Sequence, residues 1–144
     1  MRRVITAPMP AGAGTGSAIP EPVDIHHLAA RGPFLAAPAG YGTMPDIITT
    51  PYPVAVETLF DALSRVGAAR PNTRLVAAYP TRLQAHYVIR GGWVPLLLVV
   101  EAVGVIGGAA PLLHARSLNG LPGFGAPRRH VKEWLAALDA VLKE

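Results

Sequence analysis

The sequence contains no cysteine among its 144 residues, so disulfides and metal sites built on thiolates are excluded. Five histidines are present, but none of their spacings matches the HxxxH or HExxH patterns of zinc sites. The neighbours His26 and His27 would diverge from a helix or a strand, which prevents them from sharing one ligand. We therefore expect neither a metal ion nor another cofactor.

Aromatic residues are scarce, at 6% of the chain, and no aromatic-bearing nucleic-acid recognition motif occurs. The sequence also lacks a Gly-x-Ser-x-Gly elbow, a phosphate-binding loop and a dinucleotide fingerprint in the right context. The glycines of GAGTGS, residues 12–17, precede any expected strand and therefore do not form such a fingerprint. These absences disfavour nucleic acid as a partner and the common nucleotide-dependent enzymes.

Positive charge is unevenly distributed and is carried almost entirely by arginine. Eleven of the thirteen basic residues are Arg, and the net charge is −2 over residues 1–61 but +6 over residues 62–144. Arginine suits bidentate contact with carboxylates and phosphates, which favours a small anion or an acidic protein surface as partner. A GC-rich bacterial genome would also favour arginine over lysine.

No continuous apolar segment follows the two N-terminal arginines, because Pro8, Pro10 and several glycines interrupt it. We therefore expect no secretory signal and a cytoplasmic location. Residues 1–23 are rich in Ala, Gly and Pro and predict a disordered arm. Residues 24–144 then form a single α+β domain.

The longest apolar run, Trp93–Leu113, has the length of a membrane-spanning helix. Glu101 lies near its middle, and the run also contains two prolines and three glycines. Two strands joined at Gly107-Gly108 account for the same residues without placing a charge in lipid. We favour the two strands and do not expect a membrane partner; the membrane span remains the alternative.

Periodicity predicts a helix over 54–68, since Val56, Leu59, Phe60, Leu63 and Val66 share one helical face. A second helix is predicted over 127–142, and strands over 73–79, 82–90, 93–103 and 109–117. Residues 24–45 look like an irregular coat with one helical turn at 24–30. The expected fold is α+β: a four-stranded antiparallel meander with one helix before it and one long helix after it, both packed on one face.

The segment ARSLNGLPGFGAPRRHVKEWLAAL resembles the C-terminal signature of the uncharacterised domain-of-unknown-function family 1499, S-R-S-x-x-G-x-x-D-F-G-V-N-x-x-R-V-x-x-W-L-x-x-L. Upstream, APAGYGTMPDIITTPYPVAVETLFDAL is similar to the family's opening, and Arg90 in YVIRGGWVPLLLVV resembles the family's strand-ending arginine. The resemblance covers roughly residues 25–142 and implies a small α+β domain. Matching positions in the signature are Arg116, Ser117, Gly120, Phe124, Gly125, Arg129, Val131, Trp134, Leu135 and Leu138.

The chain departs from the family pattern at acidic positions. The family's Asp after the strand proline is Leu96 here, the Asp of the closing loop is Gly123, and Val-Asn is replaced by Ala126-Pro127. If the family has an acid-dependent site, this chain has lost or altered it. Many members are secreted or membrane-tethered, and the family carries no settled activity that the resemblance would imply here.

The candidate ligand-binding site is the basic loop and the start of the closing helix. Cations at a helix N-terminus are unfavourable unless something negative offsets them. An external anion, an internal carboxylate such as Glu101 or Asp46, or plain solvation each account for them. The residues of the candidate site are Arg90, Arg116, Ser117, Arg128, Arg129 and His130.

Two further clusters are interpreted as surface features. Polar side chains on one face of the strands would form a solvent-exposed basic face: Arg82, His86, Arg90, His114 and Arg116. Glu57 and Asp61, one helical turn apart, are read as solvating charges. His114 and Ser117 would lie on opposite strand faces, which excludes a nucleophile–base pair.

These observations favour a small soluble protein without catalytic activity that binds a small anionic ligand or an acidic protein partner at the basic site. The alternatives are an enzyme whose pocket is built from loops and a membrane-associated protein that uses Trp93–Leu113. No catalytic residue is assigned.

Overall fold

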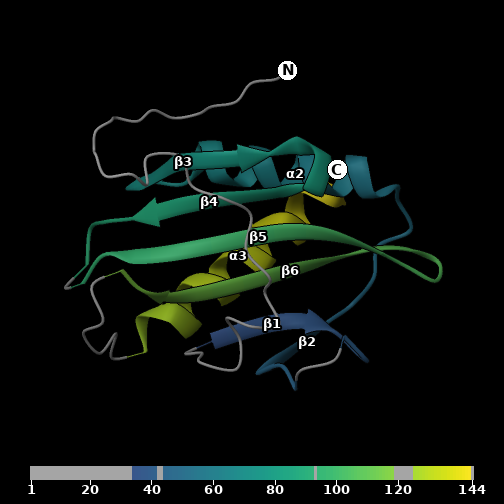
Figure 1. The fold of residues 1–144 in the computed structure, drawn as a ribbon, viewed down its shortest axis with the longest axis horizontal. Coiled ribbons are helices and arrows are strands. Elements are labelled where there is room, and N and C mark those ends of the chain that lie inside the picture. The colour runs from purple at the N-terminus through teal and green to yellow at the C-terminus, as the bar shows by residue number, and fades with distance from the viewer. Residues whose placement is uncertain (1–33, 42–43, 93, 119–124, 144) are drawn as a thin grey trace.

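A computed structural model describes residues 34–41, 44–92, 94–118 and 125–143. The described chain contains six strands, two α-helices and one short 3-10 helix (Figure 1). The expected disordered arm (1–23), the helical turn at 24–30 and the loop glycines Gly120 and Gly123 lie outside the described residues. The elements, in chain order, are β1 (Phe34–Pro38), β2 (Ile47–Thr49), α2 (Val56–Ala69), β3 (Thr73–Tyr79), η2 (Pro80–Arg82), β4 (Gln84–Ile89), β5 (Leu96–Val105), β6 (Gly108–Ser117) and α3 (Ala126–Leu142).

The strands form one mixed sheet in the order β2-β1-β6-β5-β4-β3. Strands β3 to β6 pair antiparallel in chain order, as expected, but β1 adds to β6 antiparallel and β2 adds to β1 parallel. The expectation of a four-stranded, purely antiparallel sheet is therefore wrong. The α+β class, with both helices on one face of the sheet, is confirmed (Figure 1).

The two missed strands come from the segment that the sequence presents as an irregular coat. All five residues of β1, FLAAP, are buried, so the strand shows no alternation of apolar and polar positions. Asp46, which precedes β2, is joined to β1 by two hydrogen bonds. Its backbone N–H donates to the Leu35 carbonyl, and its carboxylate accepts from the Leu35 N–H at 2.8 Å. A buried strand without a polar face cannot be distinguished by period from an apolar loop.

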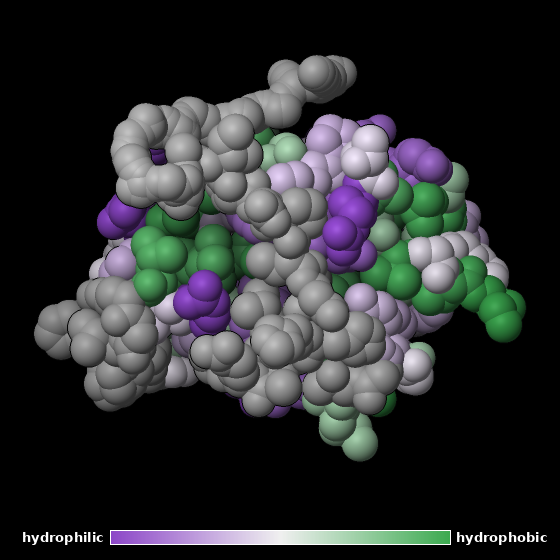
Figure 2. All heavy atoms as spheres, in the orientation of Figure 1, coloured by the Kyte–Doolittle hydropathy of each residue, from purple (hydrophilic) through white to green (hydrophobic). Residues whose placement is uncertain are grey.

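The described part of the apolar run, residues 94–113, forms most of a hairpin rather than a single helix. Strands β5 and β6 pair from Leu96↔Ser117 to Val105↔Gly108, and Gly107 in the turn has a φ of 91°, which glycine adopts without strain. Neither described helix is both long enough and apolar enough to cross a lipid bilayer. The fully exposed Ile106 lies at the hairpin tip, where Figure 2 shows apolar atoms projecting from the molecule.

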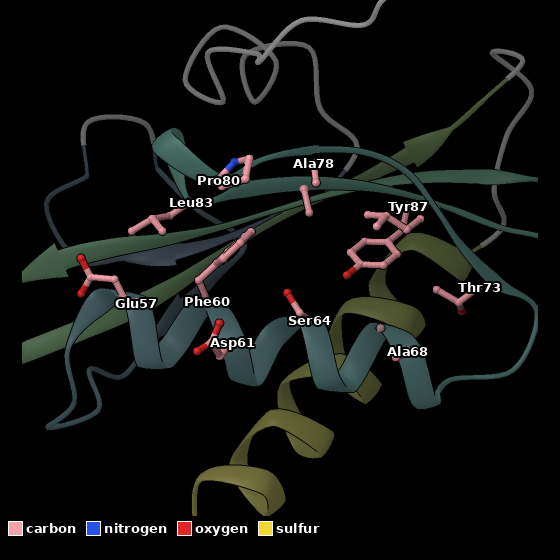
Figure 3. A pocket seen from close by; sticks show the side chains of 13 residues that line it. Glu57, Phe60, Asp61, Ser64, Ala68, Thr73, Ala78, Pro80, Leu83 and Tyr87 are labelled. Atoms are coloured by element: carbon pink, nitrogen blue, oxygen red, sulfur yellow. The ribbon is translucent and has the colours of Figure 1, made fainter. Parts of the chain in front are cut away.

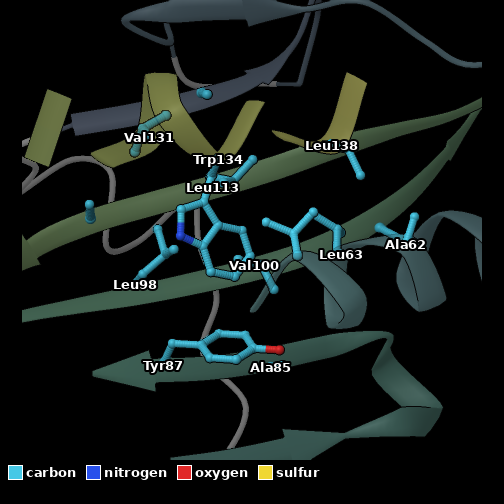
Figure 4. Close-up of a cluster of buried hydrophobic side chains, with 14 of the residues drawn as sticks. Ala62, Leu63, Ala85, Tyr87, Leu98, Val100, Leu113, Val131, Trp134 and Leu138 are labelled. Carbon is cyan, nitrogen blue, oxygen red and sulfur yellow. The ribbon is translucent and has the colours of Figure 1, made fainter. Parts of the chain in front are cut away.

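Helix α2 forms where the sequence predicts it and ends at Ala69, and the following Arg70 caps it with a hydrogen bond from its N–H to the Val66 carbonyl. Its buried residues, which face the core, are Leu59, Ala62, Leu63, Val66 and Gly67. Helix α3 buries Pro127, Val131, Trp134 and Leu138. The fully buried Trp134 occupies the centre of the core between α3 and the sheet (Figure 4).

The helices therefore cover one face of the sheet, which we call the helix face. Residues of β4, β5 and β6 that point to it alternate with residues that point to the opposite face. That opposite face carries its own buried cluster, formed by Leu35, Ala37, Val99 and Leu112.

Candidate functional site

A hollow in the described part of the chain lies between α2 and the β3–β4 end of the sheet (Figure 3). We call it the α2–β3 pocket. Its volume is about 820 Å³, within the ~300–1,000 Å³ of typical small-molecule sites. Its lining residues are Glu57, Phe60, Asp61, Ser64, Gly67, Ala68, Thr73, Leu75, Ala78, Pro80, Leu83, Ala85 and Tyr87.

The pocket exists because α2 presents a second stripe beside its core-facing one. Phe60, Ser64 and Ala68 follow one another at four-residue spacing along this stripe, and two of the three are small. The opposing wall comes from β3 and β4, where Leu75 pairs with Tyr87 and Ala78 pairs with Ala85. Small side chains on both walls leave a space that the core does not fill.

Tyr87 forms one end of the pocket and connects it to the core. Its ring packs against Trp134 at a centroid distance of 5.1 Å. Burial raises the pKa of the Tyr87 phenol to about 12, an effect that a hydrogen bond with the Ser64 hydroxyl partly opposes. Near neutral pH the Tyr87 and Ser64 hydroxyl groups in the pocket are therefore uncharged.

Phe60 marks the other end, together with the carboxylates of Glu57 and Asp61 (Figure 3). Both acidic residues are exposed and lie four residues apart on α2. No ion pair in the described structure involves either of them. Like charges at this spacing repel one another weakly, so a cation placed between them would be favourable.

The ionisable groups in the described lining of this pocket are few. The described residues that line it include no His, Cys, Lys or Arg, and the carboxylates among them are those of Glu57 and Asp61. Tyr87 is a poor base for Ser64 at neutral pH because its proton is tightly held. The described residues also contain no cluster of three or more potential metal ligands.

Two residues of the predicted basic site, Arg129 and His130, lie near one carboxylate, that of Glu133, which the sequence did not indicate as a partner. Glu133 of α3 binds the Arg70 guanidinium at the end of α2, with 2.6 Å between Nη2 and Oε1. Arg129 and His130 lie at 4.0 Å and 3.9 Å from the same carboxylate. Glu101 and Asp46, proposed as internal partners, bind Gln84 and the Leu35 N–H instead.

The surroundings of His130 disfavour the charged form of its imidazole. Burial lowers the pKa of the His130 imidazole, Arg129 and Arg70 act in the same direction, and Glu133 opposes them. Arg128 points elsewhere: its guanidinium lies over the Phe34 ring, 5.6 Å from the centroid. The start of α3 therefore carries two exposed arginines, of which Arg129 is beside an internal acid.

The other members of the predicted basic site are dispersed. Ser117 pairs with Leu96 and belongs to the helix face, whereas Arg116 pairs with Leu97 and belongs to the opposite face. Arg90 follows the end of β4 and is exposed. Arg116 and the helix-borne Arg128 therefore do not share one face of the sheet.

The face expected to be solvent-exposed and basic is buried in part. His86 and His114 are 6% and 1% exposed, which corrects the expectation for them, whereas Arg90 is exposed and Arg82, also exposed, lies in η2 rather than on a strand. Gln84 donates to Glu101 at 2.8 Å across the β4–β5 pair and is bonded to His86 Nε2 at 2.8 Å. Both ring nitrogens of His114 are buried and have no hydrogen-bond partner among the residues that the structure describes. Its position relative to Ser117, on the opposite strand face, is as predicted.

A second hollow of about 580 Å³ separates β2 from α3. Its polar groups already bind one another, since Tyr52 donates to Asp139 at 3.3 Å and Lys143 pairs with Asp139 at 3.0 Å. Burial raises the pKa of Tyr52, and the Asp139 charge and hydrogen bond act in the same direction. These satisfied groups make the α2–β3 pocket the better candidate site.

Sequence reasoning missed the α2–β3 pocket because it treated Glu57 and Asp61 as solvating charges. A signal was present: Ser64, Gly67 and Ala68 place small residues at helical spacing beyond Phe60, next to the apolar stripe. A second stripe of small residues beside a buried one indicates that a helix faces a gap. The location of the gap depends on β3, which the helix sequence does not encode.

No protein-family model matches the chain, and no curated protein matches it. Four chains among the solved structures do match. One of them is the crystal structure of Ara h 8.0201, with a TM-score of 0.48 and 14% sequence identity over 67% of this chain and 95% of that chain. A likeness of this degree carries no argument about ligand or activity.

Proposed function

We propose that this protein is a non-catalytic binding protein that holds a small, largely apolar ligand in the α2–β3 pocket. The observation that carries the proposal is a hollow of about 820 Å³ with mostly apolar walls and a few polar groups at its two ends. Such pockets are the usual sites of small organic ligands. The proposal keeps the binding role expected from the sequence and moves it away from the arginines.

Two features of the pocket support binding rather than incomplete packing. The Tyr87 ring is held by Trp134 behind it, so one wall is fixed before a ligand enters. Leu75, which is 49% exposed, gives the edge strand an apolar side chain beside the pocket. A ligand would cover this side chain and remove apolar surface from water, which is favourable at about 25 cal/mol per Å².

The proposal is tested by titrating the protein with phenylnaphthylamine, a neutral apolar dye that fluoresces on leaving water. We expect saturable binding of one dye per chain. The double variant Ala68→Leu with Ala78→Leu adds side-chain volume at the pocket walls and should weaken binding at least about tenfold, which corresponds to ~1.4 kcal/mol. Ala69→Leu, a neighbouring exposed position on α2 that does not line the pocket, is the matched control.

Melting curves of the three proteins establish that each is folded before the titrations are compared. Saturable binding that is lost in the double variant and kept in Ala69→Leu supports the proposal. Absence of saturable binding to the wild-type chain, or equal binding to the double variant, contradicts it.

The basic site remains a second candidate, for a small anion or an acidic protein surface. Helix α3 begins without a side-chain cap, and Arg128 and Arg129 are exposed in its first turn. Its first backbone N–H groups therefore suit an anion. We expect phosphate to raise the melting temperature above a sodium chloride control of equal ionic strength, and Arg128→Glu with Arg129→Glu to abolish the gain. A melting temperature indifferent to phosphate over a wide concentration range would eliminate this candidate.

A further inference from the structure

We infer that the ligand of the α2–β3 pocket is an organic cation: an apolar, ring-sized body that carries one ammonium or guanidinium group. This inference rests on the proposed function and adds the charge and orientation of the ligand. The juxtaposition behind it is that Glu57 and Asp61 flank Phe60 at one end of a mostly apolar pocket.

The first argument is the sign of the charge at the pocket. Glu57 and Asp61 supply the negative charge among the described residues that line the pocket, and no lining residue among them is basic. The chain as a whole has a net charge of +4, so this acidic end is a local reversal. A carboxylate ligand would be repelled there, whereas a cation would be attracted.

The second argument is that these two carboxylates have no cation of their own. No ion pair in the described structure involves Glu57 or Asp61, although other carboxylates on the helices have partners, namely Glu133 with Arg70 and Asp139 with Lys143. Arg65 lies one turn beyond Asp61 on α2, but it is exposed and does not line the pocket. A bound cation would relieve the repulsion between two like charges four residues apart.

The third argument is orientation. Figure 3 shows the carboxylates at the Phe60 end and the Tyr87 hydroxyl toward the opposite end. A cationic group at the Phe60 end would contact both the carboxylates and the face of an aromatic ring, which attracts cations. The apolar body would then extend past the small residues Ala78 and Ala85 toward Tyr87.

The test compares three naphthalene probes that differ in their head group: naphthylethylammonium, naphthylethanol and naphthylpropanoate. Their affinities for the full chain are measured by displacement of phenylnaphthylamine at low ionic strength. We expect the ammonium probe to bind about three- to tenfold more tightly than the alcohol, a range set by partly exposed ion pairs. The propanoate should bind most weakly, and added sodium chloride should reduce the differences.

The decisive variant is Glu57→Gln with Asp61→Asn. It should lower the affinity for the ammonium probe to that for the alcohol and leave the affinity for the alcohol within about twofold of wild type. The control variant Glu133→Gln with Asp139→Asn removes the same two charges from α3 and should retain the preference. Melting curves confirm that both variants are folded.

The outcomes separate this inference from the proposed function. If the alcohol and phenylnaphthylamine bind but the wild-type chain does not prefer the ammonium probe, the inference is overturned while the proposed function stands. A preference that survives in Glu57→Gln with Asp61→Asn, or disappears equally in the control, also overturns it. If no probe binds the wild-type chain, both fail.

Discussion

Gly67 of α2 faces the Tyr87 ring so closely that a side chain does not fit between them. An ideally placed Cβ on Gly67 would lie 2.5 Å from Tyr87 Cε2 and Cζ and 2.6 Å from the phenol oxygen. The glycine therefore allows the Tyr87 ring to pack between α2 and Trp134. A residue that normally weakens a helix is required here by the neighbouring strand.

Replacement of this glycine should destabilise the fold. Gly67→Ala gains roughly 1 kcal/mol of helix propensity but forces the buried Tyr87 ring to move, and overpacking of this kind costs about 1–3 kcal/mol. We expect a net loss of up to about 2 kcal/mol in the free energy of unfolding, measured by urea denaturation. Ala68→Gly is the matched control for helix propensity and should cost no more than about 1 kcal/mol.

The Tyr87 ring offers a direct check of this explanation. In the background of Tyr87→Leu the obstacle to a Cβ is gone, so Gly67→Ala should become neutral or stabilising. An equal cost of Gly67→Ala in both backgrounds would show that the clash with Tyr87 is not its cause.

Two buried histidines should make stability depend on pH. A histidine has a pKa near 6.5 when unfolded, whereas burial lowers the pKa of His86 and of His114 to about 4, with Arg116 lowering that of His114 further and Asp46 opposing. Between these values the unfolded chain binds protons that the folded chain does not. The free energy of unfolding should therefore fall from pH 6.5 to pH 4, by the order of 3 kcal/mol per histidine.

His114 is the better position for testing this dependence because both of its ring nitrogens lack partners among the described residues. His114→Leu replaces an unsatisfied buried polar group by an apolar one of similar size. We therefore expect the free energy of unfolding to rise by about 1 kcal/mol at pH 7 and to fall less steeply between pH 6.5 and pH 4. Urea denaturation at several pH values measures both. His130→Gln, at a less buried site, should change this fall between pH 6.5 and pH 4 much less. An unchanged pH dependence in His114→Leu would show that burial of His114 does not cause the loss of stability in acid.

Glu133 joins the two helices through Arg70, and this connection should be modest in energy. The Glu133 side chain is 43% exposed, so screening by water limits the ion pair despite the 2.6 Å contact. Glu133→Gln should reduce the free energy of unfolding by less than about 1 kcal/mol, and the difference should shrink in concentrated sodium chloride. Asp139→Asn is the comparison for Glu133→Gln, because the ion pair of Asp139 with Lys143 spans four residues of one chain segment and does not join the two helices. A loss that persists in high salt would indicate a structural role other than ion pairing.

Thr49 connects β2 to β6 by a buried hydrogen bond from its hydroxyl to the Pro111 carbonyl, at 2.9 Å. Thr49→Val preserves the shape of the side chain but removes the donor, which should cost about 1 kcal/mol. Thr50→Val, at the exposed neighbouring position, should be nearly neutral. Thermal denaturation of the two variants measures the difference, and equal melting temperatures would contradict the role given to Thr49.

The sequence was sufficient for elements whose residues repeat with a clear period. The apolar stripe from Val56 to Val66 predicted α2 closely, and the glycines at 107 and 108 placed the β5–β6 turn correctly. Strand β1 was missed because all of its residues are buried, and β2 because it has only three residues. Neither presents the alternation from which a strand is predicted.

The candidate sites depend on contacts between distant segments, which periodicity does not encode. Arg70 and Glu133 are 63 residues apart and meet because α2 and α3 pack together. Gly67 and Tyr87 similarly define the α2–β3 pocket from two separate elements. The charge pattern identified the arginines at the start of α3. The pairing of Glu133 with Arg70 next to them depends on the tertiary fold and could not be predicted from that pattern.

The outer strands of the described sheet have a consequence for the behaviour of concentrated solutions. A fibril grows when an unpaired strand edge accepts another copy in register. Strand β2 offers three residues followed by Thr50-Pro51, and β3 is interrupted by a bulge between Leu75 and Ala77 beside the exposed Arg74. Neither edge strand offers a long, regular edge on which a strand of another copy could pair, so this β-rich chain should resist fibril growth.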